Sequence, residues 1–174
     1  MTPQANTDRL QELDSFPPPD TGAPMPSLVT DDSHLFLAYI VSEPDPNGSG
    51  QPQKASAISP DEQIAIVRFQ SPYSHSFGAP NDEALEGHPL SSRGLKNYAW
   101  FEVFNSSWIK ALERMNSVHP QHRPESFKAY RHYVGTFHDS TFECVARGFD
   151  VQVHRGSMRS ALERMLQLLV NGAA

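Results

Sequence analysis

The fold depends first on residues 129–146, AYRHYVGTFHDSTFECVA. Apolar and polar residues alternate on both sides of the triplet His138-Asp139-Ser140, which predicts strands over about 129–137 and 141–146. Turn-forming residues between two such runs are typical of a β-hairpin. This stretch therefore predicts an antiparallel pair of strands joined by three residues.

The register of this hairpin decides what surrounds its internal carboxylate, Glu143. Pairing Phe137 with Thr141 places Glu143 opposite Gly135 and beside Tyr133 and Phe137. A carboxylate among aromatic neighbours either faces solvent or is placed there for a function. His138 and Asp139 are also explained by turn chemistry alone, because Asp is favoured in tight turns.

Further elements extend this hairpin into a domain. Strands are predicted at 34–41, 64–69, 98–104 and 149–153, and helices at 107–116 and 157–171. The first helix is expected to turn Trp108, Ile109, Leu112 and Met115 to the core, and the second Met158, Ala161, Leu162, Met165, Leu168 and Leu169. The sequence predicts an α+β fold: a mainly antiparallel sheet of about five or six strands with two helices packed on one face.

Composition divides the chain into two parts. Residues 1–60 contain ten of the fifteen prolines, and their eight acidic and two basic residues carry the whole net charge of −6. We expect a flexible, acidic, Pro-rich tail over 1–33 and a single domain over 34–174, with a linker-like loop at 42–60. The alternative is a strap that docks Leu10, Leu13 and Phe16 on the domain or on a partner.

The same composition narrows the class of protein. The remainder of the chain has no net charge, so we expect no nucleic-acid partner. No apolar stretch is long enough for a membrane helix, and the N-terminus has no signal-peptide pattern, so a soluble, cytoplasmic protein is expected. The single cysteine, Cys144, excludes an intramolecular disulfide, and its apolar neighbours predict a buried thiol. The oligomeric state stays open.

Residues 71–97 are the best candidate for a functional segment. They show no periodicity, and a structureless run of this length inside a domain is often a binding loop. The alternative is a covering loop packed by Tyr73 and Phe77. The candidate ligand-binding residues of this loop and of the hairpin are polar or aromatic. They are Tyr73, His75, Asn81, Asp82, Glu83, His88, Arg93, His138, Asp139 and Glu143.

Two functions fit these residues. The first is a binding domain without cofactor, which recognises a small ligand or a protein through the 71–97 loop and the adjacent sheet face. The absence of Gly-x-Ser-x-Gly, Walker and His-Glu-x-x-His motifs favours it, although whether the protein is an enzyme stays open. The alternative is a metal-dependent hydrolase or oxygenase-like enzyme with a divalent transition metal. Its ligands would come from His75, His88, His138 and Glu143, with Asp139 nearby. In either case we expect the loop to bring His75 or His88 near His138 and Glu143.

Overall fold

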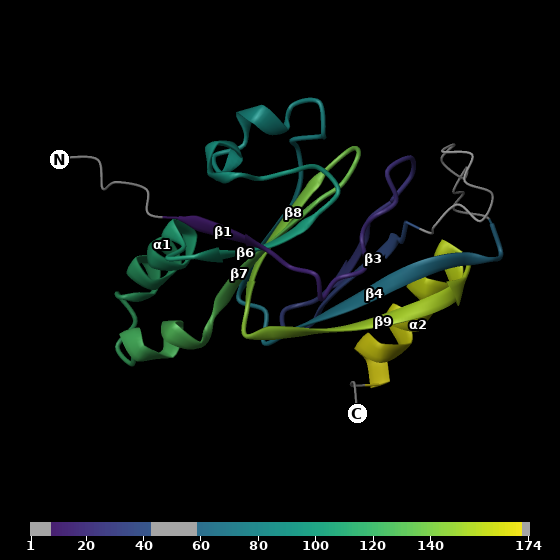
Figure 1. Cartoon of the computed structure of the whole chain (residues 1–174). Coiled ribbons are helices and arrows are strands. Elements are labelled where there is room, and N and C mark those ends of the chain that lie inside the picture. Colours follow the sequence, from purple (N-terminus) through teal and green to yellow (C-terminus); the bar gives the residue numbers. More distant parts are fainter. Residues whose placement is uncertain (1–7, 43–58, 172–174) are drawn as a thin grey trace.

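The computed structural model describes residues 8–42 and 59–171 (Figure 1). Their strands are β1 (Arg9–Glu12), β2 (Ser27–Thr30), β3 (Leu35–Ile40), β4 (Glu62–Gln70), β5 (Ser74–Gly78), β6 (Trp100–Phe104), β7 (Arg131–Thr136), β8 (Thr141–Ala146) and β9 (Gly148–Gly156). The α-helices are α1 (Ser107–Asn116) and α2 (Met158–Asn171), and the 3₁₀ turns are η1 (Leu85–Gly87), η2 (Ser91–Arg93) and η3 (Pro124–Ala129).

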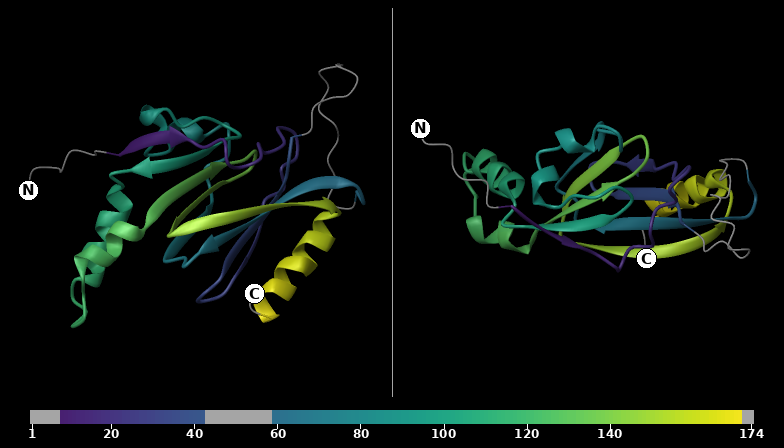
Figure 2. Two further views of the ribbon diagram at one scale, coloured as in Figure 1. Left: turned by 60° about the horizontal axis from the view of Figure 1, so that its bottom comes forward. Right: turned by 45° about the horizontal axis from the view of Figure 1, so that its top comes forward.

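The fold is α+β with antiparallel strands, as predicted, but the strands form two sheets rather than one. The five-stranded sheet has the order β1-β6-β7-β8-β5, and the four-stranded sheet has the order β2-β3-β4-β9. The two sheets pack against each other, and α2 covers the other face of the four-stranded sheet (Figure 2). None of the helices in residues 8–42 and 59–171 is long and apolar enough to cross a membrane.

Strand β3 shows why the sequence folds into layers. All six residues of LFLAYI are buried, because both faces of this internal strand are covered. Leu35, Leu37 and Tyr39 face the five-stranded sheet, while Phe36 and Ile40 pack with α2. The α2 stripe is confirmed, since Met158, Ala161 and Met165 are buried and Leu162, Leu168 and Leu169 are partly buried.

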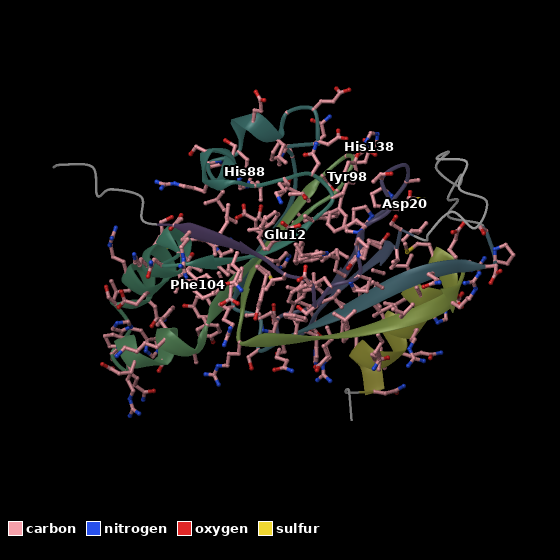
Figure 3. The ribbon with its side chains drawn as sticks, in the orientation of Figure 1. Glu12, Asp20, His88, Tyr98, Phe104 and His138 are labelled. Atoms are coloured by element: carbon pink, nitrogen blue, oxygen red, sulfur yellow. The ribbon has the colours of Figure 1, made fainter. Side chains whose placement is uncertain are left out.

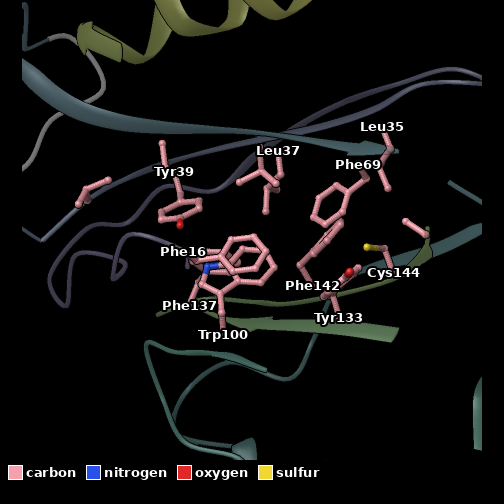
Figure 4. Packing of buried hydrophobic residues seen from close by; sticks show 14 residues of the cluster. Phe16, Leu35, Leu37, Tyr39, Phe69, Trp100, Tyr133, Phe137, Phe142 and Cys144 are labelled. Carbon is pink, nitrogen blue, oxygen red and sulfur yellow. The ribbon is translucent and has the colours of Figure 1, made fainter. Parts of the chain in front are cut away.

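The core between the sheets is largely aromatic (Figure 4). Phe16 stacks on Trp100 with ring centroids 4.1 Å apart, and on Phe149 with centroids 4.0 Å apart. The indole of Trp100 lies over Gly135, where a Cβ atom would come within 2.8 Å of the ring. Only glycine therefore allows this close approach of strand and ring. Cys144 lies in the same core as a fully buried thiol, as predicted, and burial raises its pKa.

Residues 8–33 belong to the folded domain, whereas the sequence placed them in a flexible tail. Strands β1 and β2 pair with β6 and β3, and Phe16 is only 4% exposed. The Tyr39 hydroxyl donates a 2.7 Å hydrogen bond to the carbonyl of Pro17. These contacts match the alternative of a strap docked on the domain. Residues 1–7, and 43–58 of the expected 42–60 linker, lie outside the described residues.

Two further expectations are corrected. Helix α1 has the predicted bounds, and Ser106 Oγ caps it by accepting the N–H of Ile109 at 3.1 Å. Its predicted core face is wrong, because no residue of α1 is buried and Met115 is 71% exposed. The helix lies beside β7 and η3 instead of covering a sheet. The 71–97 segment is not wholly irregular either, since β5 adds an edge strand beside β8.

We predict that Phe16→Ala destabilises the domain by about 3–5 kcal/mol, because it leaves a cavity between the two aromatic rings that Phe16 contacts. Urea denaturation of the full chain measures this loss. Val118→Ala is the control, since Val118 is 89% exposed and its truncation should change stability by less than about 0.5 kcal/mol. A loss below about 1 kcal/mol for Phe16→Ala would show that the N-terminal segment is not part of the core.

Candidate functional site

The observed hairpin turn is shorter by one residue than the sequence suggested. The N–H of Phe137 donates to the carbonyl of Ser140 at 2.9 Å, so only His138 and Asp139 form the loop. Thr136 therefore pairs with Thr141, and Val134 pairs with Glu143. The predicted pairing of Glu143 with Gly135 is therefore wrong by one residue. A shift of one residue in the register matters because it moves side chains to the opposite face of the sheet.

This register puts Glu143 on the outer face of the five-stranded sheet, away from the aromatic core. Its neighbours there are Val134 and, two residues along β7, His132. Ser76 of β5 lies opposite Glu143 on its other side. The apolar part of this face, which includes Phe101 and Val134, is covered by Leu90 of the 71–97 loop. The loop therefore closes over the sheet, as expected from the sequence.

Glu143 is held between two histidines. His132 Nε2 lies 2.8 Å from one carboxylate oxygen, and His88 Nε2 lies 3.2 Å from the other. Both imidazole side chains are 4% exposed, whereas the Glu143 side chain is 23% exposed. The imidazoles thus form a buried support behind a carboxylate that reaches solvent. Of the two loop histidines proposed for this position, His88 occupies it.

The second nitrogen of His88 fixes where its proton lies. The N–H of Leu90 donates to His88 Nδ1 at 3.1 Å, so the proton of His88 lies on Nε2. Ser106 Oγ lies 2.9 Å from His132 Nδ1 and also accepts the N–H of Ile109. Because the Glu143 carboxylate can only accept, both histidines donate Nε2–H to it.

The carboxylate is consequently ionised. Burial raises the pKa of Glu143, but the hydrogen bonds from His132 and His88 oppose this effect and lower the pKa to about 2. Each carboxylate oxygen receives an N–H, which stabilises the charged form. At neutral pH the Glu143 side chain therefore carries a negative charge.

A cavity of about 380 Å³ opens in front of Glu143. Its walls come from four places: the outer sheet face, the 71–97 loop, the start of α1 and Asp8 just before β1. The lining residues are Asp8, Ser76, His88, Pro89, Leu90, Ser107, Trp108, His132 and Glu143. Trp108 meets His132 edge to face with ring centroids 5.0 Å apart, and so forms an aromatic wall.

A second polar cluster fastens the loop to the hairpin turn. The Tyr98 hydroxyl donates to Asp82 Oδ2 at 2.5 Å, and His138 Nδ1–H donates to the same oxygen at 2.8 Å. Hydrogen bonds from Tyr98 and His138 lower the pKa of Asp82, and Asp82 in turn raises the pKa of His138. In Figure 3, Tyr98 and His138 lie together at the hairpin end, with His88 farther along the loop. This cluster acts as a clasp for the loop.

The other sequence candidates are not among the residues that line the cavity. His75 is exposed on the edge strand β5, and Tyr73 packs against Phe127 and Tyr130. Asn81 Oδ1 accepts the N–H of Ala84 within the loop. Glu83, Arg93 and Asp139 are exposed. Of the ten candidates, only His88 and Glu143 line the cavity, while Asp82 and His138 form the clasp.

The proposed set of metal ligands is not brought together. His88 contacts Glu143, whereas His138 bonds to Asp82 and His75 lies exposed on β5. Within residues 8–42 and 59–171, no group of three or more His, Cys, Asp or Glu side chains is arranged to hold a metal ion. Next to Glu143 both imidazoles direct their Nε2 atoms at the carboxylate oxygens instead of at a common point.

Sequence reasoning missed several residues of the site, among them Asp8, Trp108, His132 and the Ser106 hydroxyl that contacts His132. A signal for His132 was present, because a two-residue turn would have placed it on the face of Glu143. Asp8 gave no signal, since it reaches the site through β1 pairing with β6, across about 90 residues of sequence.

Comparisons with protein-family models, with curated proteins and with solved structures find no match to this chain. The function is therefore argued from the geometry of the cavity alone.

We predict that Glu143→Gln destabilises the protein by about 1–3 kcal/mol, because one imidazole N–H then faces an amide NH₂ and loses its acceptor. Urea denaturation at neutral pH measures the loss. Glu86→Gln is the matched control, since Glu86 is exposed on the 71–97 loop, and this variant should change stability by less than about 0.5 kcal/mol.

The pH dependence of this difference follows from the lowered pKa. Glu143 has an ordinary pKa of 4.5 and a native pKa of about 2, so its contribution is present above pH 4.5 and is lost as the pH falls toward 2. The stability gap between wild type and Glu143→Gln should narrow over that interval. A gap that stays constant down to pH 2 would show that Glu143 is not held as a carboxylate.

Proposed function

We propose that this protein is a binding domain for a small ligand, which occupies the cavity between the 71–97 loop and the outer face of the five-stranded sheet. The carrying observation is the ionised Glu143 carboxylate, which two buried histidines hold at the floor of a 380 Å³ cavity. This volume is near the lower end of the range for small-ligand pockets, about 300–1,000 Å³. A preformed cavity with a few fixed polar groups is typical of such sites.

Binding is favoured over acid–base catalysis by the chemistry of the same residues. A carboxylate with a pKa of about 2 is a weak base at neutral pH, and effective catalytic groups have pKa values near the operating pH. The Ser106 hydroxyl is 4% exposed and bonds to the side of His132 away from Glu143, so it is poorly placed as a nucleophile.

The alternative is a metal-dependent enzyme that uses His and Glu side chains of the loop and hairpin. The separation of His75 and His138 from Glu143 weighs against it. A stoichiometric transition metal in elemental analysis of the purified protein would favour it.

We place this binding domain in the cytoplasm, without a nucleic-acid partner. The first part is supported by the single cysteine, Cys144, which is a buried thiol. The second is supported by the carboxylates of Asp8 and Glu143 in the cavity, which would repel phosphate groups.

The test is a fragment screen followed by nuclear magnetic resonance of the two indole N–H groups. We expect at least one fragment from a library of cations, anions and neutral compounds to shift the Trp108 signal. Trp100 is the internal reference, because it lies in the core at 2% exposure.

A matched pair of variants locates the binding. Ser76→Tyr should abolish the shift by filling the cavity, whereas Ser74→Tyr, two residues away on β5 and outside the cavity lining, should keep it. If no fragment shifts Trp108, or if Ser76→Tyr leaves every shift unchanged, the proposed binding site is wrong.

A further inference from the structure

We infer that the ligand of this cavity is an organic cation, an ammonium group carried on a flat apolar moiety. This inference rests on the proposed binding function and adds the chemical class of the ligand. Its basis is the combination of charge, donor directions and aromatic surface in the lining of the cavity.

The charge of the lining has one sign. Asp8 and Glu143 are its acidic residues, and no Lys or Arg is among the lining residues that the structure describes. His88 adds no positive charge, because its Nδ1 atom accepts the N–H of Leu90. A bound cation would therefore offset the charge of the cavity, while an anion would increase the repulsion.

The directions of the hydrogen-bond donors give the same result. Both imidazoles donate their Nε2–H to Glu143, so neither Nε2–H is available to a ligand in the cavity. The Ser107 hydroxyl donates to Asp8 Oδ2 at 2.7 Å. The charged acceptor that remains for a ligand is the Glu143 carboxylate, which is 23% exposed. An ammonium group supplies N–H donors for this carboxylate.

The partial positive charge at the N-terminus of α1 is already neutralised. The first backbone N–H of α1, that of Ser107, donates to Asp8 Oδ1 at 2.6 Å. A helix N-terminus often attracts anions, but here the chain supplies its own carboxylate. An anionic ligand would have to displace Asp8 and would still lie beside Glu143.

The aromatic wall explains the apolar part of the ligand. Trp108, Leu90 and Pro89 are the apolar residues that line the cavity. Indole is the best aromatic partner for a cation and also offers a flat surface for stacking. In a single ring that bears an ammonium group, the ring can stack on Trp108 and the ammonium group can bind Glu143. Such a molecule also matches a cavity of about 380 Å³.

The test compares three compounds that share a benzyl group and differ in charge: benzylammonium, benzyl alcohol and phenylacetate. The full chain is titrated with each, and the Trp108 indole N–H is followed with Trp100 as reference. We expect benzylammonium to bind at least about tenfold more tightly than benzyl alcohol, which is about 1.4 kcal/mol. Phenylacetate should cause no shift of Trp108.

Two further measurements assign the effect to Glu143. Glu143→Gln should weaken benzylammonium at least about tenfold, while the matched variant Glu86→Gln on the loop surface should bind as wild type does. In wild type, added sodium chloride should weaken benzylammonium, because salt screens the charge pair. This second measurement holds even if Glu143→Gln fails to fold.

The outcomes separate the inference from the function. If benzyl alcohol or phenylacetate binds as tightly as benzylammonium, or if only anionic or neutral library fragments bind, the cavity binds ligands but the inferred preference for a cation is wrong. If salt and Glu143→Gln leave benzylammonium affinity unchanged, the inference is also wrong. If neither this series nor the library shifts Trp108, the proposed function itself fails.

Discussion

The two-residue turn at His138-Asp139 is the constraint on which the site depends. It pairs Thr136 with Thr141 and thereby sends the side chains of β7 and β8 to defined faces. With this register, Phe142 enters the aromatic core and Glu143 faces outward. A slip of one residue would exchange these faces and bury a carboxylate without partners, at a cost of several kcal/mol. The register of the hairpin is thus fixed by the core and used by the site.

The site is assembled from segments that are distant in the sequence. The sheet supplies Glu143 and His132, the loop supplies His88, and the start of α1 supplies Ser106 and Trp108. The loop is fixed at one end by its clasp on the hairpin turn and elsewhere by its apolar contacts with the outer sheet face. Both attachments are built into the fold, so the protein's own contacts position the loop wall of the cavity. A wall positioned in this way favours binding, since little ordering of the loop is required when a ligand enters.

The sequence was most informative where burial acts on a whole element. The uniformly apolar 34–41 run and the stripe of α2 gave correct elements, because burial on two faces or one leaves a clear pattern. The sequence also singled out the loop and Glu143 as a candidate site, and residues of both line the cavity. The turn length was missed, since one residue more or less leaves both strands intact but reverses their faces. Phe16 was misjudged because its burial comes from Trp100 and Phe149, which are distant in the sequence, and not from its neighbours along the chain.

The central claim is that Glu143 is an ionised carboxylate that accepts Nε2–H from two histidines. A long-range ¹H–¹⁵N correlation spectrum of the imidazoles tests it most directly, because it distinguishes protonated from unprotonated ring nitrogens. The account predicts that at neutral pH both His88 and His132 carry a proton on Nε2 and that Nδ1 of His88 is unprotonated. An unprotonated Nε2 on either ring, or a proton on Nδ1 of His88, would contradict it.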